Sequence, residues 1–137
     1  MKVLFWGTPN YAVPTLNALI ENGHEIVGVI TQPDRRRGRG NEKIGSPVKI
    51  RAIELDVLVL TPESIRKDIN AQKIIKSLKA EISIVVAFGQ LLPLNMLQAT
   101  PLGCWNGHAS LLPKWRGAGP IQWSILNGDK ETGVAIM

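Results

Sequence analysis

Short apolar runs separated by helical patterns are the feature that most constrains the fold of this 137-residue chain. Each run is too short for a helix, the run at 82–88 is rich in β-branched residues, and the continuous apolar run at 26–31 is typical of a strand covered on both faces. The runs occupy residues 2–6, 26–31, 57–60, 82–88 and 103–106, and a last one starts at residue 133. The alternation predicts an α/β fold: a doubly wound, mostly parallel sheet with helices on both faces.

Apolar residues that return every three or four positions predict helices between these runs. Pro14, Pro47 and Pro120 each suit a first helical turn, and Gly23 and Gly128 suit the position after a helix end. The predicted helices cover residues 12–20, 47–53, 74–78, a short stretch after residue 93, and 121–126.

Length and cysteine content bound the class of protein. The chain has one domain's worth of residues, and every apolar run is far shorter than the roughly 20 residues of a membrane-spanning helix. The N-terminal apolar run is also too short for a secretory signal. A single cysteine, Cys104, excludes an intrachain disulfide and fits a reducing compartment. We therefore expect a cytoplasmic, monomeric protein with no membrane partner.

Positive charge is concentrated in one segment. Between Gln32 and Lys49 lie six basic and two acidic side chains, which account for most of the formal net charge of +5. The segment is also rich in glycine and follows a predicted strand. Localised charge of this kind favours an anionic partner such as RNA, although a solvated charge run is the alternative reading of the residues alone.

Doubly wound sheets bind ligands beyond the carboxyl ends of their strands. Three segments at such ends are therefore candidates: the basic loop, the residues from Phe88 onward and the residues from Asn106 onward. The first turn, residues 7–10, lacks the Gly-x-Gly-x-x-Gly pattern, which disfavours NAD. Two histidines and one cysteine predict no metal site.

Asn106 and His108 are the candidate catalytic pair. Two residues apart at a strand end, they point to the same side. An amide can donate a hydrogen bond to a developing oxyanion, and an imidazole can move a proton near neutral pH. The apolar residues 110–113 follow in a predicted loop, which indicates a pocket lining. Taken alone, the pair could equally be structural, with His108 a satisfied loop histidine.

The whole string is more specific than the pair. Asn106-x-His108-x-Ser-Leu-Leu-Pro113 resembles the signature of the folate-dependent formyltransferases. Its continuation, from Trp115 to Trp123, resembles the methionyl-tRNA formyltransferase branch, whereas the glycinamide ribonucleotide branch usually has Pro where this chain has Ala109. The likeness extends over essentially the whole chain through residues 31–34, 38–40, 46–49 and 86–89.

The resemblance implies a Rossmann-like formyltransferase fold and transfer of a formyl group from 10-formyltetrahydrofolate to initiator methionyl-tRNA. It makes Asn106 and His108 the residues that hold and polarise the formyl oxygen, with His108 also moving the proton of the amine. The implied folate slot is formed by Ser110, Leu111, Leu112, Pro113, Phe88, Gly89, Leu91 and Leu92. The implied RNA contacts, near the acceptor end of the tRNA, are Arg35, Arg36, Arg37, Arg39 and Lys43.

The chain departs from the family pattern at one point. The family has a catalytic Asp just after a Gly-Val-x-Ile-Met run, and here that run is residues 133–137, while Asp129 precedes it. We therefore expect residues 1–137 to be an N-terminal catalytic domain that is incomplete at its C-terminal end. The C-terminal tRNA-binding domain would be absent, and activity would be low.

Two alternatives remain open from the residues. One is a formyltransferase acting on a small amine, such as a sugar nucleotide or glycinamide ribonucleotide, although the arginine-rich loop disfavours it. The other is a non-catalytic RNA- or folate-binding domain.

Overall fold

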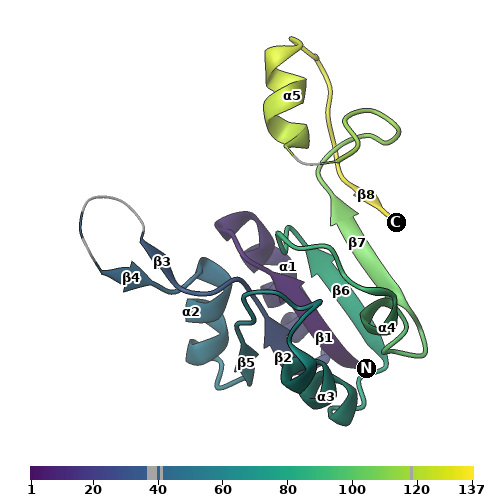
Figure 1. Cartoon of the computed structure of the whole chain (residues 1–137). Coiled ribbons are helices and arrows are strands. Elements are labelled where there is room, and N and C mark those ends of the chain that lie inside the picture. Colours follow the sequence, from purple (N-terminus) through teal and green to yellow (C-terminus); the bar gives the residue numbers. More distant parts are fainter. Residues whose placement is uncertain (37–39, 41, 118) are drawn as a thin grey trace.

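The central sheet places the carboxyl ends of its parallel strands side by side (Figure 1). The computed structural model describes residues 1–36, 40, 42–117 and 119–137. The strand order is β5-β2-β1-β6-β7-β8, and every pairing is parallel except that of β8 with β7. The strands are β1 (Lys2–Gly7), β2 (Glu25–Ile30), β5 (Val59–Leu60), β6 (Ile82–Val86), β7 (Cys104–His108) and β8 (Ala135–Ile136). The predicted doubly wound α/β fold is confirmed.

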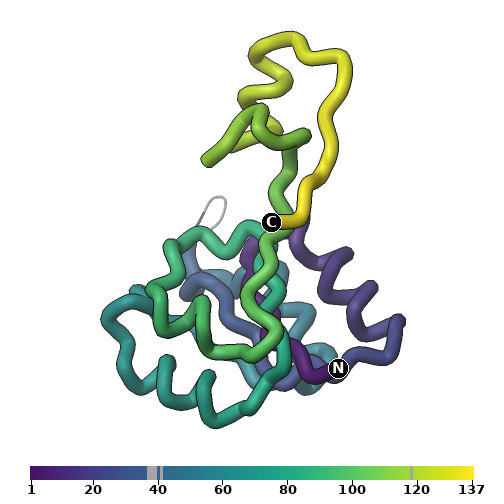
Figure 2. Tube along the Cα trace, turned by 90° about the vertical axis from the view of Figure 1, so that its right-hand side faces the viewer, coloured from purple at the N-terminus to yellow at the C-terminus, as the bar shows by residue number. Residues whose placement is uncertain are grey.

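Helices cover both faces of this sheet. A single 3-10 turn, η1 (Asn10–Ala12), leads into the first helix. The helices are α1 (Val13–Glu21), α2 (Pro47–Glu54), α3 (Ile69–Ser77), α4 (Leu94–Leu97) and α5 (Pro120–Leu126). One apolar core lies between the sheet and α1 with α2, and the other lies between the sheet and α3 with α4. Figure 2 shows α1 on one side of the sheet and α3 with α4 on the other.

Strand β1 supplies side chains to both cores because successive residues point to opposite faces. Val3 and Phe5 pack in the core under α1, while Leu4 and Trp6 pack in the core under α3. All four are at most 1% exposed. Full burial of a large apolar side chain stabilises a fold by about 1.5–3 kcal/mol. Burial on both faces therefore fixes the position of β1 and of the turn at its carboxyl end.

Several segments differ from their sequence-based predictions. Strand β6 ends at Val86, two residues earlier than predicted, and α3 begins at Ile69, five residues earlier than predicted. The third predicted strand is shorter, at Val59–Leu60, and β7 continues through His108. The stretch predicted to be a basic loop contains a two-stranded antiparallel ribbon, β3 (Arg35–Arg36) with β4 (Lys43–Ile44). All four ribbon residues are exposed. Because neither face of the ribbon is buried, the sequence has no alternation of apolar and polar residues that could have predicted these strands.

Residues 109–117 and 119–134 lie beyond the carboxyl end of β7, with α5 at their outer part (Figures 1 and 2). Helix α5 leaves most of its apolar side chains exposed, including Ile125 and Leu126 at more than 70%. Cys104 begins β7 beside the core, where burial raises the pKa of its thiol. In the described part of the chain, no helix has the length and apolarity that crossing a bilayer requires.

Gly7 lies where β1 and β6 pair closely at the carboxyl ends of the two strands. A Cβ at Gly7 would lie 2.8 Å from the carbonyl oxygen of Val86, which is backbone and cannot move aside. We predict that Gly7→Ala lowers the free energy of unfolding by about 1–3 kcal/mol, measured by urea denaturation. The matched control is Gly45→Ala, whose nearest contact is the flexible Lys49 side chain at 3.2 Å. Equal stability of the two variants would contradict the close approach.

Candidate active site

Asn106 and His108 lie on β7 with their backbones fixed on both sides. Val85 of β6 is the register partner of Asn106, and Ala135 of β8 is the partner of His108. The Asn106 N–H donates to the Met137 carbonyl at 2.7 Å, and the Met137 N–H donates back at 3.0 Å. Positions two apart on a strand share a face, so both functional side chains point the same way.

The opposite face of β7 is a separate environment. Trp105 and Gly107 lie there and line a cavity of about 100 Å³ together with residues of α1, β6 and β8. The predicted pairing of Asn106 with His108 on one face therefore agrees with how the intervening residues are placed.

His108 is held in a defined orientation. The side chain is 8% exposed, and its Nε2 lies 2.8 Å from the carbonyl oxygen of Trp115. A carbonyl can only accept, so Nε2 carries the hydrogen in the neutral ring and Nδ1 keeps its lone pair. Across the residues that the structure describes, the Asn106 side chain makes no hydrogen bond. The strand end thus offers an amide donor and an imidazole acceptor.

Trp115, which holds His108, is itself strained and braced. Its φ of +55° lies in the left-handed region, a conformation that costs a non-glycine residue about 1–3 kcal/mol. Its ring stacks on Trp123 with centroids 6.2 Å apart, and its Nε1 donates to Asp129 Oδ2 at 2.6 Å. Hydrogen bonds from Asn127 and Trp115 lower the pKa of Asp129, so this carboxylate stays ionised. Asp129 precedes the Gly-Val-x-Ile-Met run and is not at the position expected for the catalytic Asp; the Asn-Gly-Asp turn signal marks it in the sequence.

The residues predicted to line one side of a folate slot, 110–113, differ in burial. Ser110 is buried; its Oγ donates to the Lys114 carbonyl at 2.7 Å. Leu112 is partly buried, and its peptide bond to Pro113 is cis. Leu111 and Pro113 line a groove of about 530 Å³. Its other walls are charged: Lys114, Asp129, Lys130 and Glu131. The apolar loop does open on a groove, as its composition indicated.

The second half of the predicted slot follows β6. Phe88 is 2% exposed, with its ring 5.4 Å from that of Trp6, so the residue belongs to the core. Leu92 packs partly against the same core, and Leu91 is 92% exposed. In the described structure these residues do not line the 530 Å³ groove. Parallel pairing of β6 and β7 brings the two halves to the same sheet edge, not into one cavity.

Sequence reasoning missed the polar side chains that fix the loop after β6. Thr8 Oγ1 donates to the Phe88 carbonyl at 2.8 Å and accepts from the Gln32 N–H at 3.3 Å. Gln90 Nε2 donates to Gln32 Oε1 at 2.8 Å. These residues come from three separate strand ends, and no local motif connects them. Only the shared position at carboxyl strand ends could have pointed to them.

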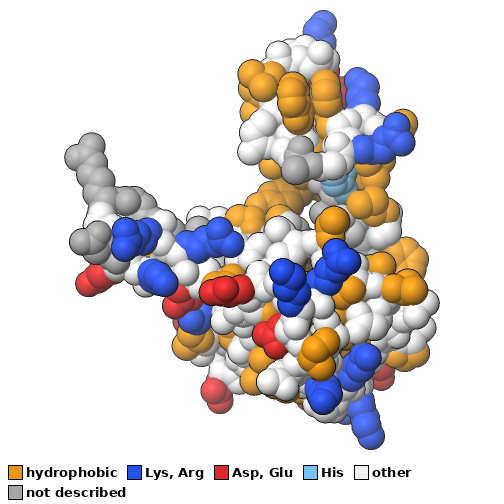
Figure 3. Space-filling view, in the orientation of Figure 1, with side chains coloured by type: hydrophobic (Ala, Val, Ile, Leu, Met, Phe, Trp, Pro, Cys, Tyr) orange, Lys and Arg blue, Asp and Glu red, His pale blue; other side chains and the backbone are white. Residues whose placement is uncertain are grey.

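The basic segment forms an arm with a fixed root. Arg35, Arg36 and Lys43 are exposed on the β3–β4 ribbon, and Figure 3 shows basic side chains on this projecting part. Arg37 and Arg39 lie outside the described residues.

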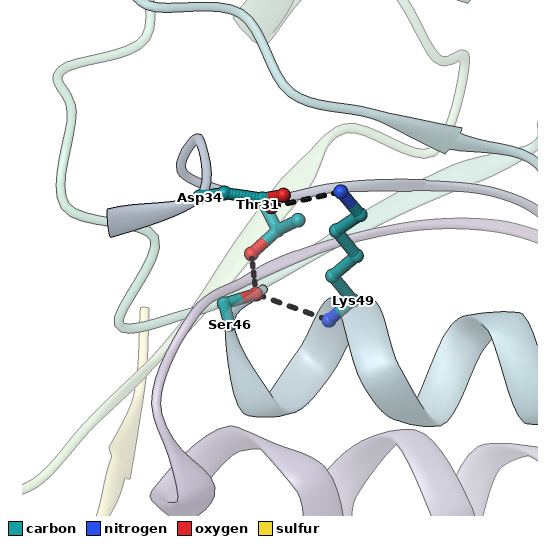
Figure 4. A network of polar contacts seen from close by, with 4 residues as sticks. All are labelled: Thr31, Asp34, Ser46 and Lys49. Carbon is teal, nitrogen blue, oxygen red and sulfur yellow. Dashed lines mark hydrogen bonds and ion pairs between the residues drawn. The ribbon is translucent and has the colours of Figure 1, made fainter. Parts of the chain in front are cut away.

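The root of the ribbon is joined by polar contacts between its two ends (Figure 4). Thr31 Oγ1 and Ser46 Oγ share a hydrogen bond of 2.6 Å, and the Lys49 N–H donates to Ser46 Oγ at 3.0 Å. Lys49 Nζ pairs with Asp34 at 2.8 Å, so these two charges offset each other. The net positive charge of the segment is therefore carried by the ribbon and not by its root.

The described residues place no three His, Cys, Asp or Glu side chains where they could hold a metal ion.

Known proteins resemble this chain in sequence. The formyl transferase family matches residues 1–137. Methionyl-tRNA formyltransferase of Synechococcus sp. (strain WH7803) is 68% identical over 137 residues, which are 100% of this chain and 40% of that protein. Methionyl-tRNA formyltransferase of Prochlorococcus marinus (strain MIT 9303) is 68% identical over 135 residues, which are 98% of this chain and 40% of that protein. The chain thus spans about 40% of the length of these curated relatives.

Solved structures share the fold at lower identity. Phosphoribosylglycinamide formyltransferase from Bacillus halodurans has a TM-score of 0.79 at 19% identity, with 99% of this chain and 70% of that chain covered. A formyltetrahydrofolate deformylase from Pseudomonas syringae pv. tomato has a TM-score of 0.74 at 17% identity, covering 98% of this chain and 44% of that chain. The resemblance predicted from the string between Asn106 and Trp123 is confirmed, and the chain belongs to the formyl transferase family.

Proposed function

We propose that this chain carries the catalytic part of a methionyl-tRNA formyltransferase, which transfers a formyl group from 10-formyltetrahydrofolate to the amino group of initiator methionyl-tRNA. The observation that carries the proposal is the pair of side chains at the end of β7. Among the described residues, the Asn106 amide makes no hydrogen bond, and the His108 ring is held through Nε2 with no partner at Nδ1. The relatives named methionyl-tRNA formyltransferase, at 62–68% identity, support this acceptor.

Formyl transfer is an acyl transfer and needs an oxyanion donor and a proton carrier. The folate donor supplies the formyl group on a nitrogen atom. The Asn106 amide N–H can donate to the carbonyl oxygen as negative charge develops on it. His108 Nδ1 can take the proton that the attacking amine loses and return it to the departing nitrogen. The new C–N bond forms to the amine and the C–N bond to the donor breaks, so atoms and charge balance.

The loop after β6 fits a heteroaromatic ring such as that of folate. Within the described part of the chain, the backbone N–H groups from Gly89 to Leu92 donate to no partner. Unpaired backbone donors beside apolar side chains are the kind of surface that orients a planar ligand with polar edges. Leu111 and Pro113 supply apolar area at the neighbouring strand end. We therefore assign folate binding to the two loops together.

The exposed basic ribbon favours tRNA over a small amine as acceptor. Binding a small substrate does not require arginines on a projecting ribbon, whereas arginines placed in this way bind the phosphate backbone of a nucleic acid. The structural neighbours that act on small amines show the fold alone at their low identity. A non-catalytic binding domain would leave the arrangement of Asn106 and His108 without a role.

We also propose that the protein works as a monomer in the cytoplasm. The single free cysteine, Cys104, supports a reducing compartment.

Asn106 is the proposed oxyanion donor. In a chain extended to the length of the curated relatives, Asn106→Ala should lower kcat by about 10²–10³, because one preorganised donor is removed. Asn70→Ala, at an exposed position of α3, is the matched control and should leave the rate unchanged. The measurement is formyl transfer to charged initiator tRNA at saturating donor. A kcat within threefold of wild type would contradict the assignment.

The β3–β4 ribbon is the proposed phosphate-binding part of the chain. In the extended chain, neutralising Arg35, Arg36, Arg37 and Arg39 should weaken tRNA binding, with the log–log salt slope smaller by roughly 0.7–0.9 for each phosphate that is no longer bound. The matched control removes the same charge from the exposed cations around α3: Arg66, Lys67, Lys73 and Lys76. Affinity is measured by filter binding across a salt series. Equal slopes for the two variants would show that the ribbon binds no phosphate.

A further inference from the structure

Gln90 is the best-connected side chain in the loop after β6, and the proposed chemistry does not use it. Its Nε2 donates to Gln32 Oε1 at 2.8 Å and to the Pro62 carbonyl at 3.0 Å. Its Oε1 accepts from the Ile65 N–H at 2.8 Å. A carbonyl only accepts and a backbone N–H only donates, so the two ends of the Gln90 amide are assigned without ambiguity.

The loop has few other anchors. Thr8 holds the Phe88 carbonyl, but beyond it Leu91 is 92% exposed. The loop also begins in an unusual conformation, with φ of +51° at Ala87 and +94° at Gly89. A Cβ at Gly89 would lie 2.7 Å from Gln32 Nε2, so the loop backbone passes directly over the Gln32 side chain. A loop with unpaired amides and few contacts opens easily unless a side chain ties it down.

We propose that Gln90 is a positioning residue for donor binding: its amide holds the backbone from Phe88 to Leu92 in the shape that receives the folate ring, with Gln32 as the matching acceptor. The identity of the ligand rests on the proposed function, whereas the ordering of the loop does not. Gln32 lies between β2 and the basic ribbon, and its Oε1 also accepts from Arg35 Nη2 at 3.5 Å. The same contact thus ties the donor loop to the segment that leads into the ribbon.

The two glutamines have different roles, and this makes the proposal testable. In the described part of the chain, the Gln32 side chain forms hydrogen bonds through its oxygen alone, so Glu can replace it and still accept from Gln90. Gln90 uses its nitrogen twice, so Gln90→Glu would set a carboxylate against two acceptors while keeping the acceptor for Ile65. A role limited to filling space would not distinguish these two isosteric changes.

The experiment measures binding of 5-formyltetrahydrofolate, a stable isomer of the donor, to the 137-residue chain by titration calorimetry. Gln90→Glu and Gln90→Leu should weaken binding about 5- to 30-fold, because both variants remove a pair of donated hydrogen bonds. Gln32→Glu should retain the affinity within about twofold. Gln98→Leu changes an exposed glutamine after α4 and serves as the matched control, with no expected effect.

NMR backbone order parameters of the same variants give a readout that needs no ligand. The order parameters from Gly89 to Leu92 should fall in Gln90→Glu and Gln90→Leu. The N–H of Ile65, which donates to Gln90 Oε1, should exchange with solvent faster only in Gln90→Leu. Should a Gln90 variant fail to fold, Gln32→Leu removes the acceptor from the other side and should loosen the loop in the same way.

Unchanged binding and unchanged loop order parameters in the Gln90 variants, or in Gln32→Leu, would overturn the positioning role. A wild-type chain that does not bind the folate probe would instead count against the proposed function. The order parameters would then still decide whether Gln90 orders the loop.

Discussion

The parallel pairing of β1, β6 and β7 is the constraint on which the rest of the site depends. It aligns the carboxyl ends of three strands, so that the turn after β1, the loop after β6 and the end of β7 meet at one edge. The buried side chains of β1 hold this alignment from both faces. A shift of one residue between β6 and β7 would turn Asn106 and His108 to the opposite face, where Trp105 and Gly107 now lie.

At the carboxyl ends of these strands, hydrogen bonds orient His108 and Trp115, and the basic side chains of the ribbon lie on a separate, projecting part. His108 is oriented by the Trp115 carbonyl, and Trp115 in turn is braced by the Asp129 carboxylate. The positive charge projects on the ribbon, while Lys49 at the root is paired with Asp34. An exposed ion pair of this kind contributes little to stability, about 0–1 kcal/mol, so its effect lies mainly in fixing where the ribbon starts. At the end of β7, the Asn106 amide is a hydrogen-bond donor and the His108 ring is an acceptor, as acyl transfer requires.

Features set by local periodicity could be predicted from the sequence. The strands and helices follow from apolar spacing, and the positions of Asn106 and His108 follow from a two-residue period on a strand. The hydrogen bonds that orient His108 and hold the loop after β6 could not be predicted from local periodicity. Gln32 and Gln90 are 58 positions apart, and Trp115 reaches His108 through a backbone carbonyl, which leaves no mark on residue type. The β3–β4 ribbon was missed because its exposed, charged residues pair only through the backbone.

The most direct test of the proposed site is a structure of the chain with 5-formyltetrahydrofolate bound. We predict that the pterin ring contacts the backbone between Gly89 and Leu92 and lies against Leu111 or Pro113. The Asn106 amide and the His108 ring should face the end of the ligand that carries the one-carbon group. A ring bound on the Trp105 face of β7, or away from both loops, would contradict this placement of the site.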